Sequence, residues 1–170
     1  MKQKLREEID KKDTWDLTYI FKSEDDFNKA YEEAKDELQK VVSFKGKLLL
    51  NSDNLLSYLE YDDNIERKLY RLYYYAHLNL DVDTTNTSSQ EREGKVVNLL
   101  QEYSVLSSFV LPELLKGNYD DVKKYIEEND KLKKYSFNLE NIYRYQNHSL
   151  TEENEKLLST IKPEESEENK

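Results

Sequence analysis

The chain has 170 residues, and its 26 basic and 36 acidic residues give a net charge of −10 at pH 7. A chain of this length usually forms one domain, and it buries enough surface to fold without a metal or a disulfide. The acidic balance and the lack of a basic stripe exclude nucleic acid as an expected partner, because an acidic surface repels a phosphate backbone. The chain has no cysteines, which excludes disulfides and thiolate zinc sites and suits the cytoplasm.

Neither a secretory signal nor a membrane partner is expected. The amino terminus, MKQKLREEIDKKD, has no apolar core. The longest apolar runs are a few residues, whereas a bilayer span needs about 20. We therefore expect a cytoplasmic protein.

Residues 1–22 are predicted to be a charged amino terminus followed by an extended arm. The arm contains the segment TWDLTYIF, in which Trp15, Leu17, Ile20 and Phe21 lie close together. This segment is too short for a well-formed helix. Its aromatic side chains either dock on a larger body or close the end of the chain's own bundle as a hydrophobic staple.

A helical domain is predicted over residues 23–160. Its first helix begins at Ser23, with Asp26 as a capping-box partner, and ends before Gly46. The apolar residues of this helix recur with helical spacing and predict its buried face: Phe27, Ala30, Tyr31, Ala34, Leu38, Val41 and Val42.

The next helix is predicted to start at Asn51 or Ser52, to bend slightly at residues 62–64, and to continue as a second long helix to about Asp81. We expect the bundle to be organised around this second part, IERKLYRLYYYAHLNL. Its apolar side chains recur at i, i+3 and i+4. They are Ile65, Leu69, Leu72, Tyr73, Ala76 and Leu80.

The polar run DVDTTNTSSQ, residues 81–90, predicts a turn. It superficially resembles a calcium-binding loop, because Asp81 and Asp83 are two positions apart. The pattern fails, since Asn86 stands where such a loop needs glycine and Arg92 stands where it needs a bidentate glutamate. We expect no metal there.

A long helix is predicted from Ser88 to about Leu115, capped by Thr87 or Ser88, and it is expected to be the most buried helix. Gly94 costs about 1 kcal/mol in a helix interior, which a close helix crossing would offset. Pro112 predicts a bend or a break nearby. The apolar side of this helix comprises Val96, Val97, Leu100, Tyr103, Leu106, Val110 and Leu114.

Three shorter helical segments complete the predicted domain. They are residues 119–129, after a Gly-Asn turn, residues 135–144, and a last amphipathic segment that begins at Thr151. The acidic tail, residues 161–170, is poor in apolar residues and is expected to be disordered. The sequence thus predicts an all-α fold, an irregular antiparallel bundle of about five to seven helices with an extended amino-terminal arm.

No catalytic or metal-binding constellation is found in the sequence. The two histidines, His77 and His148, are 71 positions apart, so the helical zinc motif HExxH is absent. We expect His77 to make a surface or capping interaction with Asp81, and His148 to lie in a loop. There is no glycine-rich phosphate loop, no GxSxG motif and no cysteine nucleophile. We therefore assign no catalytic and no metal-binding residue, and the sequence names no substrate-binding residue.

The run Tyr73-Tyr74-Tyr75 could present aromatic rings to a ligand. Consecutive helical residues point about 100° apart, however, so the three rings cannot form one platform. We expect these tyrosines to pack in the core.

Three segments, in order, resemble oligoendopeptidase F of the thimet-type zinc metallopeptidases. They are TWDLTYIFKSEDDF, LYRLYYYAHLNLDVDTTN, and FVLPELL followed by NLENIYRYQNHSLTEENEKLLS. The last is similar to that family's stretch of an Arg, a His, Leu-Thr or Leu-Ser, and Glu-x-x-Leu-Leu. Order and spacing agree over residues 14–159.

The resemblance implies a helical amino-terminal lobe that covers the deep channel of an enzyme that cuts short peptides. In that family the catalytic core carries HExxH and a later Glu as zinc ligands, and none of those residues is in this chain. The chain is thus expected to hold no cofactor and to be inactive alone, with zinc in a missing carboxyl-terminal catalytic domain. That domain is its expected partner, and short peptides are the partners of the full-length enzyme. The alternative is a stand-alone helical protein-interaction module, or a truncated peptidase relative without catalysis.

Overall fold

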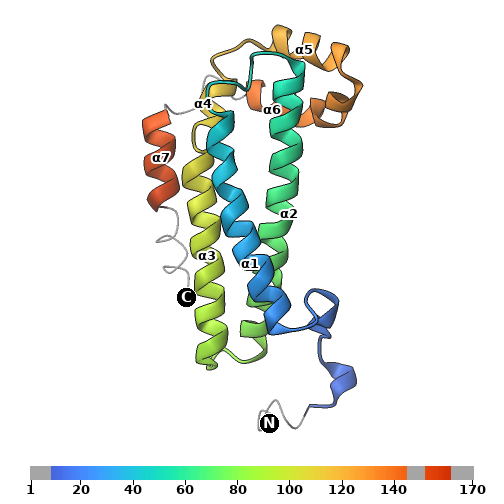
Figure 1. Ribbon diagram of the computed structural model, residues 1–170, viewed down its shortest axis with the longest axis vertical. Helices are drawn as coiled ribbons and strands as arrows, with labels where there is room; N and C mark the ends of the chain where they lie inside the picture. Colours follow the sequence, from blue (N-terminus) through green and yellow to red (C-terminus); the bar gives the residue numbers. More distant parts are fainter. Residues whose placement is uncertain (1–8, 145–151, 162–170) are drawn as a thin grey trace. The chain divides into compact units, whose positions relative to one another are not determined.

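The computed structural model describes residues 9–144 and 152–161. Within these ranges the chain forms seven α-helices, joined in part by short 3-10 helices, and no strand. The predicted all-α fold is therefore confirmed. The helices are α1 (Glu24–Leu38), α2 (Ser52–Val82), α3 (Thr87–Ser107), α4 (Val110–Leu114), α5 (Tyr119–Glu128), α6 (Ser136–Arg144) and α7 (Glu152–Ile161) (Figure 1).

The chain divides into two compact units. Unit 1 comprises Met1–Glu37 and Glu66–Leu100, and unit 2 comprises Leu38–Ile65 and Gln101–Lys170. Helices α2 and α3 each contribute residues to both units. The expected division into an arm, a helical domain and an acidic tail stays a prediction, and the tail from residue 162 lies outside the described residues.

Two short 3-10 helices, Lys11–Asp13 and Leu17–Tyr19, lie in the segment predicted to be an extended arm. Asp16 caps the second one, because its carboxylate accepts hydrogen bonds from the Thr18 hydroxyl at 2.6 Å and from the Thr18 N–H at 3.0 Å. The same two hydrogen bonds lower the pKa of Asp16. The arm is therefore turned at two places.

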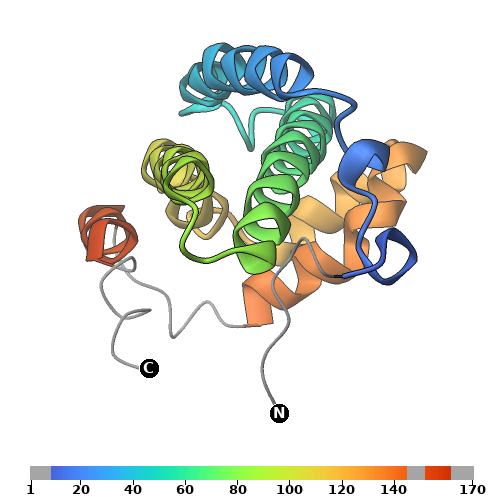
Figure 2. The ribbon, with the colours of Figure 1, turned by 90° about the horizontal axis from the view of Figure 1, so that it is seen from below.

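The helices of unit 1 are α1, the second half of α2 and the first two thirds of α3. These three segments lie at the corners of a triangle in the end-on view (Figure 2), and α2 runs antiparallel to the other two. Ser23 caps α1 as predicted, since its Oγ accepts the N–H of Asp26 at 3.1 Å and donates to the Asp26 carboxylate at 2.9 Å. The buried hydrophobic side chains of unit 1 are Phe21, Phe27, Ala34, Leu69, Leu72, Ala76, Val96 and Leu99.

Helix α1 ends before the predicted stop. It reaches Leu38 and gives way to a 3-10 helix, Gln39–Phe44. Gly46 then adopts a φ of +78°, the left-handed conformation that glycine reaches without a Cβ clash. The glycine thus ends the 3-10 extension and not the α-helix itself.

Helix α2 is one continuous helix of 31 residues, where two helices with a bend between them were predicted. Asn51 caps it, because its Oδ1 accepts the N–H of Asn54 at 2.9 Å. The polar residues 62–64 do not interrupt it. Asp62 is tolerated within the helix because the hydroxyl of Tyr103 donates a hydrogen bond to its carboxylate.

The cap of α3 differs from the prediction. Helix α3 begins at Thr87, but the capping side chain is Asn86, whose Oδ1 accepts the N–H of Ser89 at 3.0 Å. The prediction that Thr87 or Ser88 caps the helix was wrong. Asn is among the strongest capping residues, and it stands one position earlier in the same polar run.

The long helix predicted from Ser88 to about Leu115 differs from the structure in its length and its burial. Helix α3 ends at Ser107 and α4 starts at Val110, so the break expected near Pro112 is confirmed. A Cβ added at Gly94 would meet no atom within 4 Å, so no close helix crossing at this position offsets the cost of the glycine. Helix α2 has more buried hydrophobic side chains than α3, which contradicts the expectation that α3 is the most buried helix.

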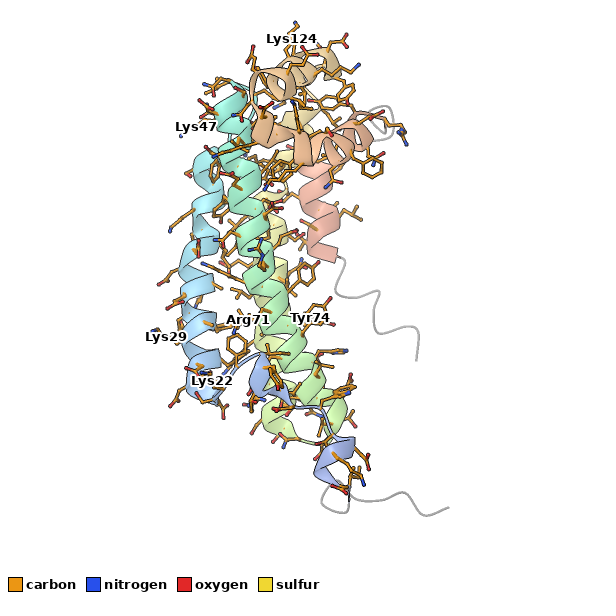
Figure 3. All side chains as sticks on the ribbon, turned by 90° about the vertical axis from the view of Figure 1, so that its right-hand side faces the viewer. Lys22, Lys29, Lys47, Arg71, Tyr74 and Lys124 are labelled. Atoms are coloured by element: carbon orange, nitrogen blue, oxygen red, sulfur yellow. The ribbon has the colours of Figure 1, made fainter. Side chains whose placement is uncertain are left out.

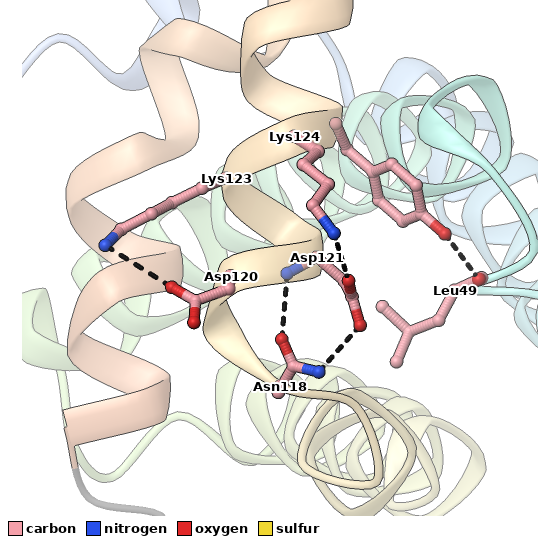
Figure 4. A network of polar contacts seen from close by, with 7 residues as sticks. Leu49, Asn118, Asp120, Asp121, Lys123 and Lys124 are labelled. Carbon is pink, nitrogen blue, oxygen red and sulfur yellow. Dashed lines mark hydrogen bonds and ion pairs between the residues drawn. The ribbon is translucent and has the colours of Figure 1, made fainter.

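In unit 2, α5, α6 and the 3-10 helix Asp130–Tyr135 between them contact one another. Figure 4 shows how α5 begins: Asn118 Oδ1 accepts the N–H of Asp121 at 2.9 Å, which confirms the predicted turn at this position. The Asp121 carboxylate in turn accepts hydrogen bonds from Lys124 Nζ at 2.9 Å and from Asn118 Nδ2 at 2.7 Å. The interaction with Lys124 is the main reason why the pKa of Asp121 is lowered.

The loop before α2 is held by a carboxylate from α4. Glu113 accepts two backbone hydrogen bonds, from the N–H of Gly46 at 2.7 Å and from the N–H of Leu48 at 2.8 Å. The loop and Glu113 both belong to unit 2. Charge-assisted bonds of this kind are stronger than neutral ones.

The last helix is tied to α3 within unit 2. The side-chain amide of Gln101 donates a hydrogen bond to the backbone carbonyl of Ser159 in α7. The predicted start of this segment, Thr151, lies outside the described residues.

Candidate functional site

A pocket of about 430 Å³ opens on unit 1 between the arm, α1 and α2. Its volume lies in the range of small-ligand sites, about 300–1,000 Å³. Three cationic side chains on neighbouring elements belong to it, Lys22, Lys29 and Arg71 (Figure 3). The complete lining is Thr18, Tyr19, Ile20, Phe21, Lys22, Asp26, Lys29, Ala30, Glu33 and Arg71.

Phe21 anchors the arm and so forms one wall of the pocket. The Phe21 side chain is 5% exposed, and its ring makes edge contacts with the rings of Phe27 at 5.6 Å and Tyr75 at 5.2 Å between centroids. The guanidinium of Arg71 lies 4.4 Å from the Phe21 ring centroid and donates a hydrogen bond to the carbonyl oxygen of Ile20. Arg71 therefore connects α2 to two successive residues of the arm.

Only one of the two arm aromatics singled out in the sequence packs in this way. Phe21 is buried within unit 1, as the hydrophobic-staple interpretation requires. Trp15, by contrast, is 58% exposed. Exposure of a large aromatic side chain fits the other interpretation, in which the arm contacts a further body.

The pocket carries a positive charge in an acidic chain. Three cations and two carboxylates, Asp26 and Glu33, line it, so its charge is +3 − 2 = +1, compared with −10 for the whole sequence. Asp26 already accepts the hydroxyl of Ser23. Neither Lys22 nor Lys29 has an ion-pair partner within residues 9–144 and 152–161.

His77 lies in α2 between two carboxylates. Its Nε2 is 3.7 Å from the carboxylate of Asp81, as the sequence predicted, and its Nδ1 forms a hydrogen bond with Glu93 of α3. The imidazole also stacks on the ring of Tyr73 at 5.2 Å between centroids. In the part of the chain that the structure describes, no group of three or more His, Asp or Glu side chains is arranged to hold a metal ion. His148 lies outside that part.

The three consecutive tyrosines have three different environments. Tyr75 is partly buried and stacks on the core residue Phe27 at 5.3 Å between centroids, so the prediction of core packing is met in part for this residue. Tyr74 is 55% exposed, and its ring lies 6.2 Å from that of Tyr70, which is 47% exposed. Tyr73 is partly buried, like Tyr75, and stacks on His77. The prediction of core packing was wrong for Tyr74, because its side chain is exposed.

Comparison with known proteins identifies what these helices resemble. A family model described as Oligopeptidase F matches residues 113–164. Oligopeptidase PepF of Bacillus subtilis (strain 168) is 35% identical over 154 residues, which cover 91% of this chain and 23% of that protein. The chain matches only the amino-terminal domain of oligoendopeptidase F.

Two further comparisons agree with that match. Group B oligopeptidase PepB of Streptococcus agalactiae serotype III (strain NEM316) is 32% identical, over 91% of this chain and 26% of that protein. The crystal structure of oligoendopeptidase-F from Enterococcus faecium superposes with a TM-score of 0.76 at 30% identity, covering 82% of this chain and 28% of that one. The chain therefore spans about a quarter of the length of the relatives that it matches. These findings confirm the resemblance seen in the sequence.

The pocket was not predictable from these motifs. Its cations and carboxylates come from three elements, and Arg71 is 51 positions from the carbonyl that it binds. The only sequence signal was that the arm segment and Arg71 lie inside two of the three segments that carry the family resemblance. Among the described residues, no helix combines the length and the apolar character that a membrane crossing requires.

Proposed function

We propose that this chain is the non-catalytic amino-terminal lobe of a zinc-dependent oligoendopeptidase that hydrolyses short peptides, and that it helps to form the substrate channel. The observation that carries the proposal is the match of 91% of the chain to about a quarter of a protein named as an oligopeptidase. In this proposal the zinc ligands and the general base belong to the remaining three quarters of such an enzyme, which works in the cytoplasm. HExxH is absent from this sequence, so hydrolysis depends on that part.

The physical contribution of the lobe is then a wall that admits extended peptides and keeps folded proteins away from the zinc. Unit 1 supports this role, because it combines a buried aromatic core with a surface on which Tyr70 and Tyr74 are half exposed. Such rings provide apolar contact area with little loss of side-chain entropy. They suit a surface along which peptides of varied sequence pass.

A chimeric enzyme tests the proposal. The matching segment of the Bacillus subtilis oligopeptidase is replaced by this chain, and a second variant lacks the segment altogether. We expect the chimera to hydrolyse a quenched short peptide and to leave a long, folded protein uncut, whereas the deletion variant loses activity or loses this size limit. Equal behaviour of the two variants on both substrates would show that the lobe does not shape the channel.

The isolated chain is the control for catalysis. Mixed with zinc and the same quenched peptide, it is expected to give no turnover. Turnover that a chelator abolishes would reveal a metal site within this chain and would overturn its assignment as non-catalytic.

The exposed aromatic side chains favour a second candidate, a stand-alone helical protein-interaction module. Trp15, Tyr70 and Tyr74 all belong to unit 1, and each is close to half exposed or more. A module of this kind has no role in peptide hydrolysis. It therefore predicts a chimera that is folded but no more active or selective than the deletion variant.

A further inference from the structure

The lining of the pocket on unit 1 includes two lysines, Lys22 and Lys29, that neither the helical fold nor the channel role requires. We propose that it binds the carboxyl-terminal end of a short peptide, with the free carboxylate held by Lys22, Lys29 and Arg71 and the last side chain resting on Ile20 and Ala30. This inference rests on the proposed function, because it takes the peptides handled by the full-length enzyme as the ligands.

The three cations provide the anion-binding part of the site. Lys22 and Lys29 are exposed and have no ion-pair partner among the described residues, so their ammonium groups are available to a ligand. Arg71 uses one N–H to hold the Ile20 carbonyl, and a guanidinium has five N–H donors in a fixed fork. Its contact with the Phe21 ring fixes the plane of the fork, so little ordering remains to be done when an anion binds.

The charge of the pocket favours a carboxylate over a phosphate. The three cations lie beside Asp26 and Glu33, which leaves a charge of +3 − 2 = +1 that a monoanion neutralises. A phosphate dianion would reverse that balance and face two carboxylates. Outside the pocket the chain is strongly acidic, so a negatively charged ligand gains most at this place.

The apolar part of the lining indicates what accompanies the carboxylate. Ile20 and Ala30 are partly exposed, and both border the pocket together with the ring of Phe21. An apolar side chain next to a charged end group therefore meets a matching surface. The volume of about 430 Å³ holds a terminal residue and leaves an open side through which the rest of a peptide extends.

A titration of the full chain tests this inference. Isotopically labelled protein is titrated with an acetylated short peptide ending in leucine, with the same peptide as its carboxamide, and with inorganic phosphate. We expect the free carboxylate peptide to shift backbone amide resonances of Thr18–Lys22 and of Asp26–Glu33, and the carboxamide to bind at least about tenfold more weakly, as loss of a charge-assisted contact implies.

Matched lysine variants separate the pocket from general surface charge. The double variant Lys22→Gln with Lys29→Gln is expected to weaken binding of the carboxylate peptide about tenfold or more. Lys47→Gln removes an exposed lysine from unit 2 that does not line the pocket (Figure 3), and it is expected to leave the affinity unchanged. All three positions are exposed, so the amide spectra of the variants should keep the dispersion of the parent.

Three outcomes would overturn the inference. These are equal binding of carboxylate and carboxamide peptides, binding of phosphate but not of peptide, and the absence of any shift in the folded chain. Each leaves the channel-forming role untouched, because the chimeric enzyme measures that role separately. Conversely, the chimera could behave like the deletion variant while the labelled chain still binds the carboxylate peptide. That result would refute the channel role and support the peptide site.

Discussion

Replacement of Phe21 by alanine is expected to release the arm and to abolish the pocket. The Phe21 ring is 5% exposed and makes edge contacts with Phe27 and Tyr75, while Arg71 covers its face. Truncation of a buried Phe to alanine typically costs about 3–5 kcal/mol. Because the arm is joined to α1 by only a few residues, the loss is expected in the docking of the arm more than in the stability of the three helices.

The size of the effect follows from the contacts that disappear. Burial of a Phe side chain contributes about 1.5–3 kcal/mol. Each aromatic pair adds about 0.5–1.5 kcal/mol, and the cation–π contact adds about 0.5–2 kcal/mol. The lower ends of these ranges, with two aromatic pairs, give about 3 kcal/mol, which changes the equilibrium between docked and released arm roughly a hundredfold.

Amide hydrogen exchange in the arm measures this change. The N–H groups of Ile20 and Phe21 both donate to the carbonyl of Leu17, at 2.9 and 3.2 Å, so each reports on the turn that the anchor stabilises. In the Phe21→Ala variant we expect position 20 to exchange roughly a hundredfold faster, as the docking equilibrium implies, with little change in the core of α2. Tyr19→Ala is the control, because the Tyr19 ring is 90% exposed on the same turn. The reasoning is refuted if Ile20 keeps its protection in the Phe21 variant, or loses as much of it in the Tyr19 variant.

Three further substitutions test the helices. Gly94→Ala should raise the free energy of unfolding by about 1 kcal/mol, because the added methyl group meets no atom within 4 Å and alanine is the better helix former; urea unfolding checks this, and a lower value would contradict it. Glu113→Gln puts an NH₂ donor opposite one of the two backbone N–H groups that the carboxylate binds, so it should lower the free energy of unfolding by about 1–3 kcal/mol. An unchanged value would mean that water binds these N–H groups equally well. Burial raises the pKa of Asp62 above its ordinary 3.8, so in the native protein the carboxyl keeps its proton to higher pH than in the unfolded chain. The free energy of unfolding therefore falls as the pH rises through the raised pKa. Asp62→Asn lacks this loss, and its Tm relative to the parent should increase with pH over that window; a constant difference would refute the assignment.

The helix starts were predictable where one local side chain satisfies the first free amides. At Ser23 the serine and the aspartate three positions on bind each other and the backbone, so the sequence and the structure agree. The start of α3 was harder to predict, because the polar run before it offers several capping residues in succession. Asn86 caps the helix in preference to Thr87 since its side-chain oxygen reaches the N–H of Ser89.

The continuity of α2 could not be read from its own residues. Asp62 and its neighbours resemble a helix break, because short polar side chains compete with the helical backbone for hydrogen bonds. What keeps Asp62 in the helix is the hydroxyl of Tyr103, 41 positions further along the chain. One of the two carboxylates beside His77 also comes from a distant part of the chain, because Glu93 follows His77 by 16 positions and lies on another helix.

The functional assignment depends on the same distinction between local and distant information. An enzyme that binds zinc through HExxH shows itself in a short motif, because the ligands lie one helical turn apart. A lobe that guides peptides needs no such spacing, and its binding groups can come from any elements that meet. In this chain Lys22, Lys29 and Arg71 come from the arm, α1 and α2. They line one pocket because Phe21, buried against Phe27, Tyr75 and Arg71, anchors the arm. Release of the arm should therefore weaken the binding of a peptide carboxylate, even though Phe21 carries no charge. Unchanged affinity in the Phe21→Ala variant would show that the pocket binds the carboxylate without the anchoring of the arm by Phe21.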